Sequence, residues 1–165
     1  KGVVFLVRTF LSWLKRTNGD SVLHIAGSGT QQESIAHMAK GQKGIIIHGK
    51  VDRASLPQLF RDVDVTIVPS LCYENSPTVI FESFSFGVPV LASRVEGIAE
   101  LIREGENGMT FETEDENSLM QALDRCVQTR QTLGAMGKRT GESLNGLGQE
   151  AYIEQLAALY KGSIK

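Results

Sequence analysis

Two glutamates with seven residues between them are the strongest candidates for chemistry in this sequence. Glu74 lies in a loop after a predicted strand, and Glu82 lies within the helix predicted to follow. Glu82 is surrounded by apolar positions with no lysine or arginine within a helical turn, which is costly for a carboxylate unless a polar group pairs with it. Its two acceptor oxygens suit a vicinal diol such as a ribose. A salt bridge to a distant arginine, or a partly exposed position, explains Glu82 equally well at this point.

The start of the helix that carries Glu82 adds a possible anion site. Ser76 followed by Pro77 predicts an N-cap and a first helical residue, with the helix running to about Phe86. Thr78 would share a face with Glu82, and the backbone amides of residues 76–79 would face the loop. A helix terminus contributes at most about 2 kcal/mol, so a diphosphate would also need cations. Lys1 is a candidate cation, although composition alone favours a frayed terminal lysine.

Alternating strands and helices would position these groups. Apolar runs predict strands at 22–26, 44–49, 65–70 and 88–93, with a short edge strand after 106–108. Helices are predicted at 3–16, at about 30–40, after a Ser55 cap, at 76–86, at 97–104, and from about 115 to 165, where the last ones would be separated near 134–137 and 146–148. This alternation predicts an α/β fold with a parallel sheet covered by helices. Ligands bind such sheets at the carboxyl ends of the strands, here the loops 27–30, 48–51, 70–76 and 93–97.

Composition narrows the class of protein. The chain has 165 residues, 41% of them hydrophobic, which is enough for one domain with its own core. Its net charge of −2 argues against nucleic acid as a partner, and no apolar run is long enough to cross a bilayer. Two cysteines form neither a disulfide framework nor a metal site, so a reduced, cytoplasmic domain is expected. The Lys1-Gly2 start suggests a piece of a longer protein.

The segments ENSPTVIFE, SFSFGVPVLAS and EGIAELIREGENG together resemble the donor-binding core of retaining glycosyltransferases of the GT-B fold, family 4. Lys1-Gly2 before an amphipathic helix, VLHIAGSG, and HGKVDRASLPQLFRDVDVTIVPS resemble further segments of that family in the same order. The resemblance covers nearly the whole chain. It implies a Rossmann-like parallel sheet flanked by helices, forming the C-terminal half of such an enzyme, with residues 1–165 as one nucleotide-sugar-binding domain.

The resemblance also implies a role for each matching residue. Glu82 would hold the ribose hydroxyls, and Glu74, the catalytic candidate, would contact sugar hydroxyls near the reacting carbon. The other implied donor-binding residues are Lys1 at the diphosphate, Gly49, Lys50 and Val51 at the base, and Asn75, Ser76, Pro77, Thr78 and Val79 at the helix start. Transfer would retain the anomeric configuration, with no protein-bound metal and no cofactor besides the donor.

Parts of the family pattern are absent from this sequence. An arginine on a strand before Lys1, that strand itself, and the N-terminal acceptor domain have no counterpart here. The fragment alone is therefore expected to bind donor weakly and not to catalyse transfer. The acceptor, a glycan or a lipid-linked molecule, would bind the missing domain. The full-length protein would work in the cytoplasm or at the cytoplasmic face of the membrane, in polysaccharide, lipopolysaccharide or other glycoconjugate synthesis.

Other interpretations stay open or are set aside. A nucleotide-sugar epimerase, a glycogen-synthase-like enzyme and a non-catalytic nucleotide-binding module remain alternatives. A phosphoacceptor domain is disfavoured because Ser70 stands where its aspartate would be. His24 is expected to have a structural role, and His48 is a candidate to line the nucleotide pocket. Cys72 is expected to be a buried thiol.

Overall fold

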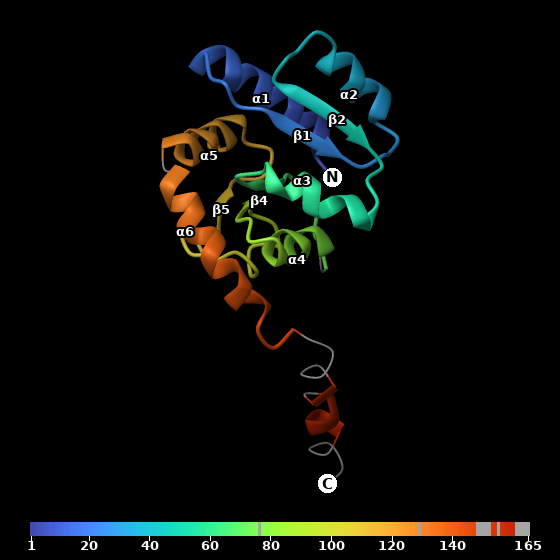
Figure 1. The fold of residues 1–165 in the computed structure, drawn as a ribbon, viewed down its shortest axis with the longest axis vertical. Coiled ribbons are helices and arrows are strands. Elements are labelled where there is room, and N and C mark those ends of the chain that lie inside the picture. The colour runs from blue at the N-terminus through green and yellow to red at the C-terminus, as the bar shows by residue number, and fades with distance from the viewer. Residues whose placement is uncertain (76, 129, 148–152, 155, 161–165) are drawn as a thin grey trace.

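The computed structural model describes residues 1–75, 77–128, 130–147, 153–154 and 156–160. Within these ranges the chain forms an α/β fold in which every strand pair is parallel (Figure 1). The elements follow the order α1 (Val3–Thr17), β1 (Leu23–Ala26), α2 (Gln32–Ala39), β2 (Ile45–Gly49), η1 (Arg53–Ser55), α3 (Leu56–Arg61), β3 (Thr66–Val68), α4 (Thr78–Ser85), β4 (Val90–Ser93), β5 (Gly108–Phe111), α5 (Glu116–Gln128), α6 (Arg130–Thr140) and η2 (Gly141–Leu144).

The strands form two sheets rather than one continuous sheet. β1 pairs with β2, and β3, β4 and β5 form a second sheet with β4 in the middle. The expected parallel α/β architecture and the expected edge position of the strand after 106–108 are both confirmed. One edge of β1 and one edge of β3 have no strand partner among the described residues, and both strands line the same cleft.

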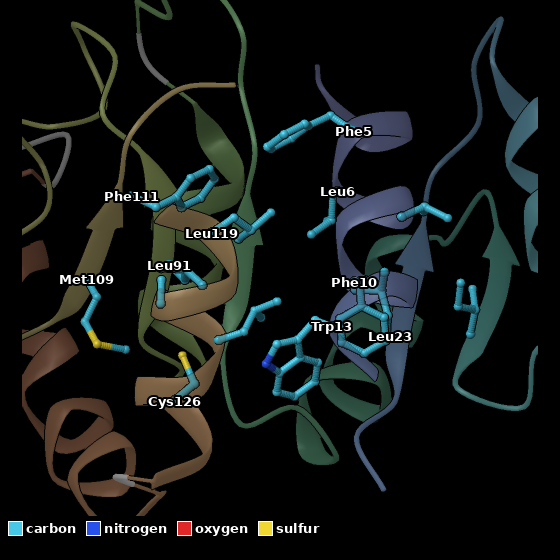
Figure 2. Packing of buried hydrophobic residues seen from close by; sticks show 14 of the residues in the cluster. Phe5, Leu6, Phe10, Trp13, Leu23, Leu91, Met109, Phe111, Leu119 and Cys126 are labelled. Atoms are coloured by element: carbon cyan, nitrogen blue, oxygen red, sulfur yellow. The ribbon is translucent and has the colours of Figure 1, made fainter. Parts of the chain in front are cut away.

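Helix α1 joins the two sheets through the larger core. Its apolar positions recur at helical spacing, so Phe5, Leu6, Phe10 and Trp13 lie on the buried side of the helix. Figure 2 shows Phe5, Leu6 and Trp13 directed toward residues of α5 and of the second sheet, among them Leu119. A polar contact also joins α1 to α5 at this core, since Trp13 Nε1 donates a 2.7 Å hydrogen bond to Asp124 Oδ1 on α5.

A second, smaller core fixes α4, the helix that carries Glu82. Ile80 and Phe84 are buried on one side of α4 and pack in a cluster with Val68 of β3 and Val90 of β4. Glu82 lies between these two positions in the sequence, so the packing that buries them also sets the direction in which Glu82 projects.

The prediction of a helix at 97–104 is wrong. The segment forms consecutive turns, in which Ala99 N donates to Val95 O but Leu101 N donates to Ile98 O. Gly97 starts it with φ +80°, outside the right-handed helical region. At the other end, the amide of Arg103 donates to the Asn107 side chain, at 2.7 Å, and is thus withdrawn from a helical bond.

The C-terminal helices divide at a different place from the one expected. α5 ends at Gln128 and α6 begins at Arg130, so Gly134 and Gly137 lie inside α6 rather than between helices. Gly137 lets α6 approach the turn after α4, because a Cβ atom there would collide with the carbonyl oxygen of Gly87. The boundary expected near 146–148 falls partly outside the described residues.

The expected cap of the helix after residue 55 also needs correction. The Ser55 side chain makes no capping hydrogen bond, and Asp52 is the residue that caps this region instead. Asp52 Oδ1 accepts a 2.8 Å hydrogen bond from the amide of Ser55. The short turn η1 precedes α3, so the free amides that need a cap lie three residues earlier than the sequence suggests.

Candidate functional site

The loops that follow β3 and β4 meet at the carboxyl edge of the second sheet. The amide of Glu74 donates to the carbonyl oxygen of Glu96 at 3.3 Å, which ties one loop to the other. Gly97 lies so close that a Cβ atom there would collide with the Glu74 carbonyl oxygen. The backbone of Glu74 is therefore held by contacts with the neighbouring loop.

Lys1 reaches Glu74 although 72 residues separate them in the sequence. Lys1 Nζ lies 2.7 Å from Glu74 Oε1, and the two side chains are 74% and 15% exposed. Gly2, with φ +70°, makes this possible, because a Cβ atom there would collide with the carbonyl oxygen of Pro69. Two of the expected site residues are thus in direct contact.

Ser70 is a site residue that the sequence reasoning did not select. It is only 2% exposed, and its hydroxyl donates a 2.9 Å hydrogen bond to Glu74 Oε1. The hydrogen bond from Lys1 lowers the pKa of Glu74, partial burial opposes that effect, and the bond from Ser70 lowers the pKa further. A serine directly after Pro69 at a strand end was the only available signal, and many structural serines share it.

Glu82 lines a cleft of about 840 Å³ together with Lys50, Val51 and Val79. No ion pair or hydrogen bond to its carboxylate occurs within the described ranges, so of its two structural interpretations the partly exposed position is the one observed. Part of the cleft runs between the free edges of β1 and β3, where its lining is mainly apolar. The cleft therefore joins an apolar slot inside the fold to a carboxylate at the strand ends.

Helix α4 begins one residue later than expected. Pro77 is the N-cap with ψ 101°, and Thr78 is the first helical residue. The proline ring restricts φ to helical values but leaves ψ free, so Pro77 can precede the helix instead of opening it. Asn75, Thr78 and Val79 are exposed at this start, while Ser76 lies outside the described residues.

Two histidines, one within β1 and one within β2, contact each other next to the segment expected at the base. His24 Nδ1 and His48 Nε2 lie 2.9 Å apart, and the rings are stacked. Partial burial, and then the proximity of His48, lower the pKa of His24, whereas Asp62 opposes that shift. His24 lines the cleft. The amide of Gly27 donates to the carbonyl oxygen of Gly49, which ties the loop after β1 to the last residue of β2.

Three further observations concern features that the sequence raised. Cys72 is exposed, so the expected buried thiol at that position is wrong, and Cys126 is the buried one. Across the described ranges no group of three or more His, Cys, Asp or Glu side chains is arranged to hold a metal ion. No helix in the described part of the chain is both long and apolar enough to span a membrane.

Residues 1–129 match the family model for glycosyl transferases group 1. The chain belongs to this family. Among curated relatives of this group 1 domain, an uncharacterized glycosyltransferase of Methanocaldococcus jannaschii is 30% identical over 77% of the chain and 33% of its own length. A D-inositol 3-phosphate glycosyltransferase of Thermobifida fusca is 30% identical over 68% of the chain and 26% of its length. The chain thus spans about a third or less of these two relatives.

The solved structures confirm the expected fold. The Anabaena protein HepE, in complex with UDP and glucose, superposes on this group 1 domain with a TM-score of 0.76 over 95% of the chain and 44% of HepE, at 19% identity. A glycosyltransferase from Rickettsia africae gives a TM-score of 0.82 over the whole chain and 45% of its own length, at 20% identity. The parallel α/β fold is therefore of the GT-B type that the motifs indicated.

Proposed function

We propose that this chain is the donor-binding domain of a glycosyltransferase and that it binds a nucleotide-diphosphate sugar. The observation that carries the proposal is the convergence of Lys1, Glu74 and the start of α4 beside the cleft that contains Glu82. A cation, amides at a helix start and two carboxylates are the groups that a diphosphate flanked by a ribose and a sugar requires.

The proposal assigns a role to each site residue. Glu82 accepts hydrogen bonds from the ribose, and Glu74 accepts them from the transferred sugar. Lys1 and the first amides of α4 bind the diphosphate, and Gly49, Lys50 and Val51 line the base. The relative that was solved with UDP and glucose supports this choice of ligand class.

The proposed reaction is transfer of the sugar with retention of its anomeric configuration. Positive charge at the diphosphate stabilises the leaving group as the bond to the sugar breaks, without a protein-bound metal. Lys1 and the α4 terminus supply that charge. The acceptor, a glycan or a lipid-linked molecule, binds a preceding domain of the whole protein, which acts in the cytoplasm or at the cytoplasmic membrane face.

A longer protein is also part of this proposal, and the two free strand edges support it. Gly2 lies against the carboxyl end of β3, and α1 runs from there to β1. A strand entering α1 from before Lys1 would fill the slot between β1 and β3, forming a right-handed strand–helix–strand unit with α1 and β1. That strand would convert the two sheets into one.

Calorimetric titration with UDP, GDP, ADP and UDP-glucose tests the donor site. We expect one nucleotide to bind selectively, and Glu82→Gln to weaken that binding at least tenfold. Glu106→Gln is the matched control, because it removes an exposed carboxylate away from the cleft. Equal affinity in both variants would contradict the role of Glu82. If the chain binds no nucleotide at millimolar concentration, the same titration on the longer protein decides whether the preceding strand is required or the donor site is wrong.

A further inference from the structure

We propose that Ser70 is a positioning residue for the Glu74 carboxylate and that Ser93 holds Ser70 in place. This inference rests on the proposed function, since it assigns Glu74 to the sugar half of the donor. It adds two buried hydroxyl groups, neither of which would touch the ligand.

The first link is the hydrogen bond from Ser70 to Glu74. Ser70 Oγ lies 2.9 Å from Oε1, and the serine is buried at the end of β3 while Glu74 stays partly accessible. A buried donor at a strand end has little freedom to move, so it defines the position of the carboxylate more firmly than the exposed Lys1 side chain can.

The second link is the hydrogen bond from Ser93 to Ser70. Ser93 is the last residue of β4, is 1% exposed, and donates a 2.6 Å hydrogen bond from Oγ to the carbonyl oxygen of Ser70. Its hydroxyl also lies 3.3 Å from the carbonyl oxygen of Val68. Ser93 thereby fixes the backbone where β3 ends and the Glu74 loop begins.

Both donors to the Glu74 carboxylate use the same oxygen atom. Lys1 and Ser70 both bond to Oε1, and no side chain in the described ranges donates to Oε2. A sugar hydroxyl can therefore donate to Oε2 without displacing either group. If a diphosphate draws Lys1 away, Ser70 continues to hold Oε1. The carboxylate would then stay oriented at the stage when the sugar must be bound.

The test compares Ser70→Ala, Ser70→Thr and Ser93→Ala with the unchanged chain. Ser83→Ala is the matched control, because Ser83 is also a buried serine with a bonded hydroxyl, directed to Thr66 and Val88 rather than to Glu74. Circular dichroism establishes that each variant is folded. The two readouts are the carboxyl pKa of Glu74 from carbon NMR and the ratio of affinities for UDP-glucose and UDP.

We expect Ser70→Ala to raise the Glu74 pKa, and Ser93→Ala to raise it less. Ser70→Thr keeps the hydroxyl donor and should give the Glu74 pKa of the unchanged chain. Ser83→Ala should also leave the Glu74 pKa unchanged. Preference for UDP-glucose over UDP should fall roughly threefold to tenfold in Ser70→Ala, since the loss of one intramolecular hydrogen bond leaves the carboxylate less firmly oriented, while affinity for UDP itself stays constant.

Two results would overturn the inference. One is a Glu74 pKa that is the same in Ser70→Ala as in the unchanged chain. The other is an equal loss of UDP and UDP-glucose affinity in Ser70→Ala and Ser83→Ala, which would indicate a general structural role. The pKa readout needs no nucleotide. If the chain binds neither ligand, the longer protein decides the proposed function, and NMR still decides whether Ser70 positions Glu74.

Discussion

The ammonium group of Lys1 lies 2.7 Å from the carboxylate of Glu74, so the two groups expected at different parts of a nucleotide sugar neutralise each other in this structure. A diphosphate that binds Lys1 must compete with Glu74 for the same cation. Drawing Lys1 toward phosphate would remove one of the two donors to Glu74 Oε1 and leave the Ser70 bond, while Oε2 is open to a sugar hydroxyl in either case.

The Glu74 pair predicts a specific pH dependence of stability. The folded-state pKa of Glu74 lies below its unfolded value, so the pair's contribution is complete above the unfolded pKa and is lost as pH falls through the folded one. Glu74→Gln should therefore show a shallower loss of stability below about pH 4.5. At pH 7 its cost should stay under about 1 kcal/mol, because Lys1 is exposed to solvent. Urea unfolding at pH 7 and pH 3 measures both effects. The same loss of stability between pH 7 and pH 3 in Glu74→Gln and in the unchanged chain would contradict the prediction.

Substitution of Gly97 should disturb the Glu74 loop. Gly97→Ala adds a Cβ atom where the Glu74 carbonyl oxygen lies, and it also places alanine at φ +80°. Gly105→Ala is the matched control, since it has nearly the same φ, +77°, with open space around it. The control should cost about 1–2 kcal/mol for the left-handed backbone alone. Gly97→Ala should cost more in thermal unfolding and shift the Glu74 amide in NMR, and equal losses would show that the close approach is unimportant.

Two glycines of α6 should respond in opposite directions. Gly134 is exposed and a Cβ atom there would point into open space, so Gly134→Ala should stabilise the helix by about 1 kcal/mol. Gly137→Ala places a Cβ atom against the Gly87 carbonyl oxygen, and it should destabilise the domain despite the same gain in helix propensity. Denaturant unfolding of both variants tests this. Stabilisation by Gly137→Ala would mean that α6 can move away from Gly87 at little cost.

His24 should make the domain less stable in mild acid. Its folded-state pKa lies below the unfolded value of about 6.5, so the unfolded chain binds the proton more readily, and stability falls as pH drops through that region. His24→Gln should reduce the loss between pH 7.5 and pH 5, as measured by thermal unfolding. His37→Gln, at an exposed histidine on α2, should leave the curve unchanged. An unchanged curve for His24→Gln would remove His24 as the cause.

The two cysteines should differ sharply in reactivity. Cys72 is exposed, whereas Cys126 lies on the buried face of α5, and burial raises the pKa of Cys126 to about 11. Because the thiolate is the reactive form, a water-soluble maleimide at pH 7 should modify Cys72 and leave Cys126 intact. Mass spectrometry of the folded and urea-unfolded chain distinguishes the sites. Equal modification of both cysteines in the folded chain would show that the core around α5 opens readily.

Much of the fold follows from local sequence pattern. The apolar spacing of residues 3–16 predicts α1 to within a residue at either end, and the β-branched run at 44–49 predicts β2, because hydrophobic periodicity determines which face each element buries. Glu74 and Glu82 were also identifiable, since their spacing and the ENSPTVIFE motif between strand and helix lie within one continuous segment.

The remaining features depend on contacts between distant parts of the chain. The segment 97–104 has helical composition, yet the Gly97 turn and the Asn107 side chain prevent a regular helix. Cys72 was expected to be a buried thiol because no His or Asp pattern near it would activate it, but loop conformation decides its exposure.

The sequence by itself determined the alternation of strands and helices, the family, and the two candidate carboxylates, because each is encoded by neighbouring residues. Only the tertiary structure decided that Lys1 pairs with Glu74, that Ser70 and Ser93 lie beneath that carboxylate, and that β1 and β3 face each other across a slot. Hydrogen bonds are short and directional, so a partner far along the sequence is selected only when packing brings the two groups within about 3 Å of each other.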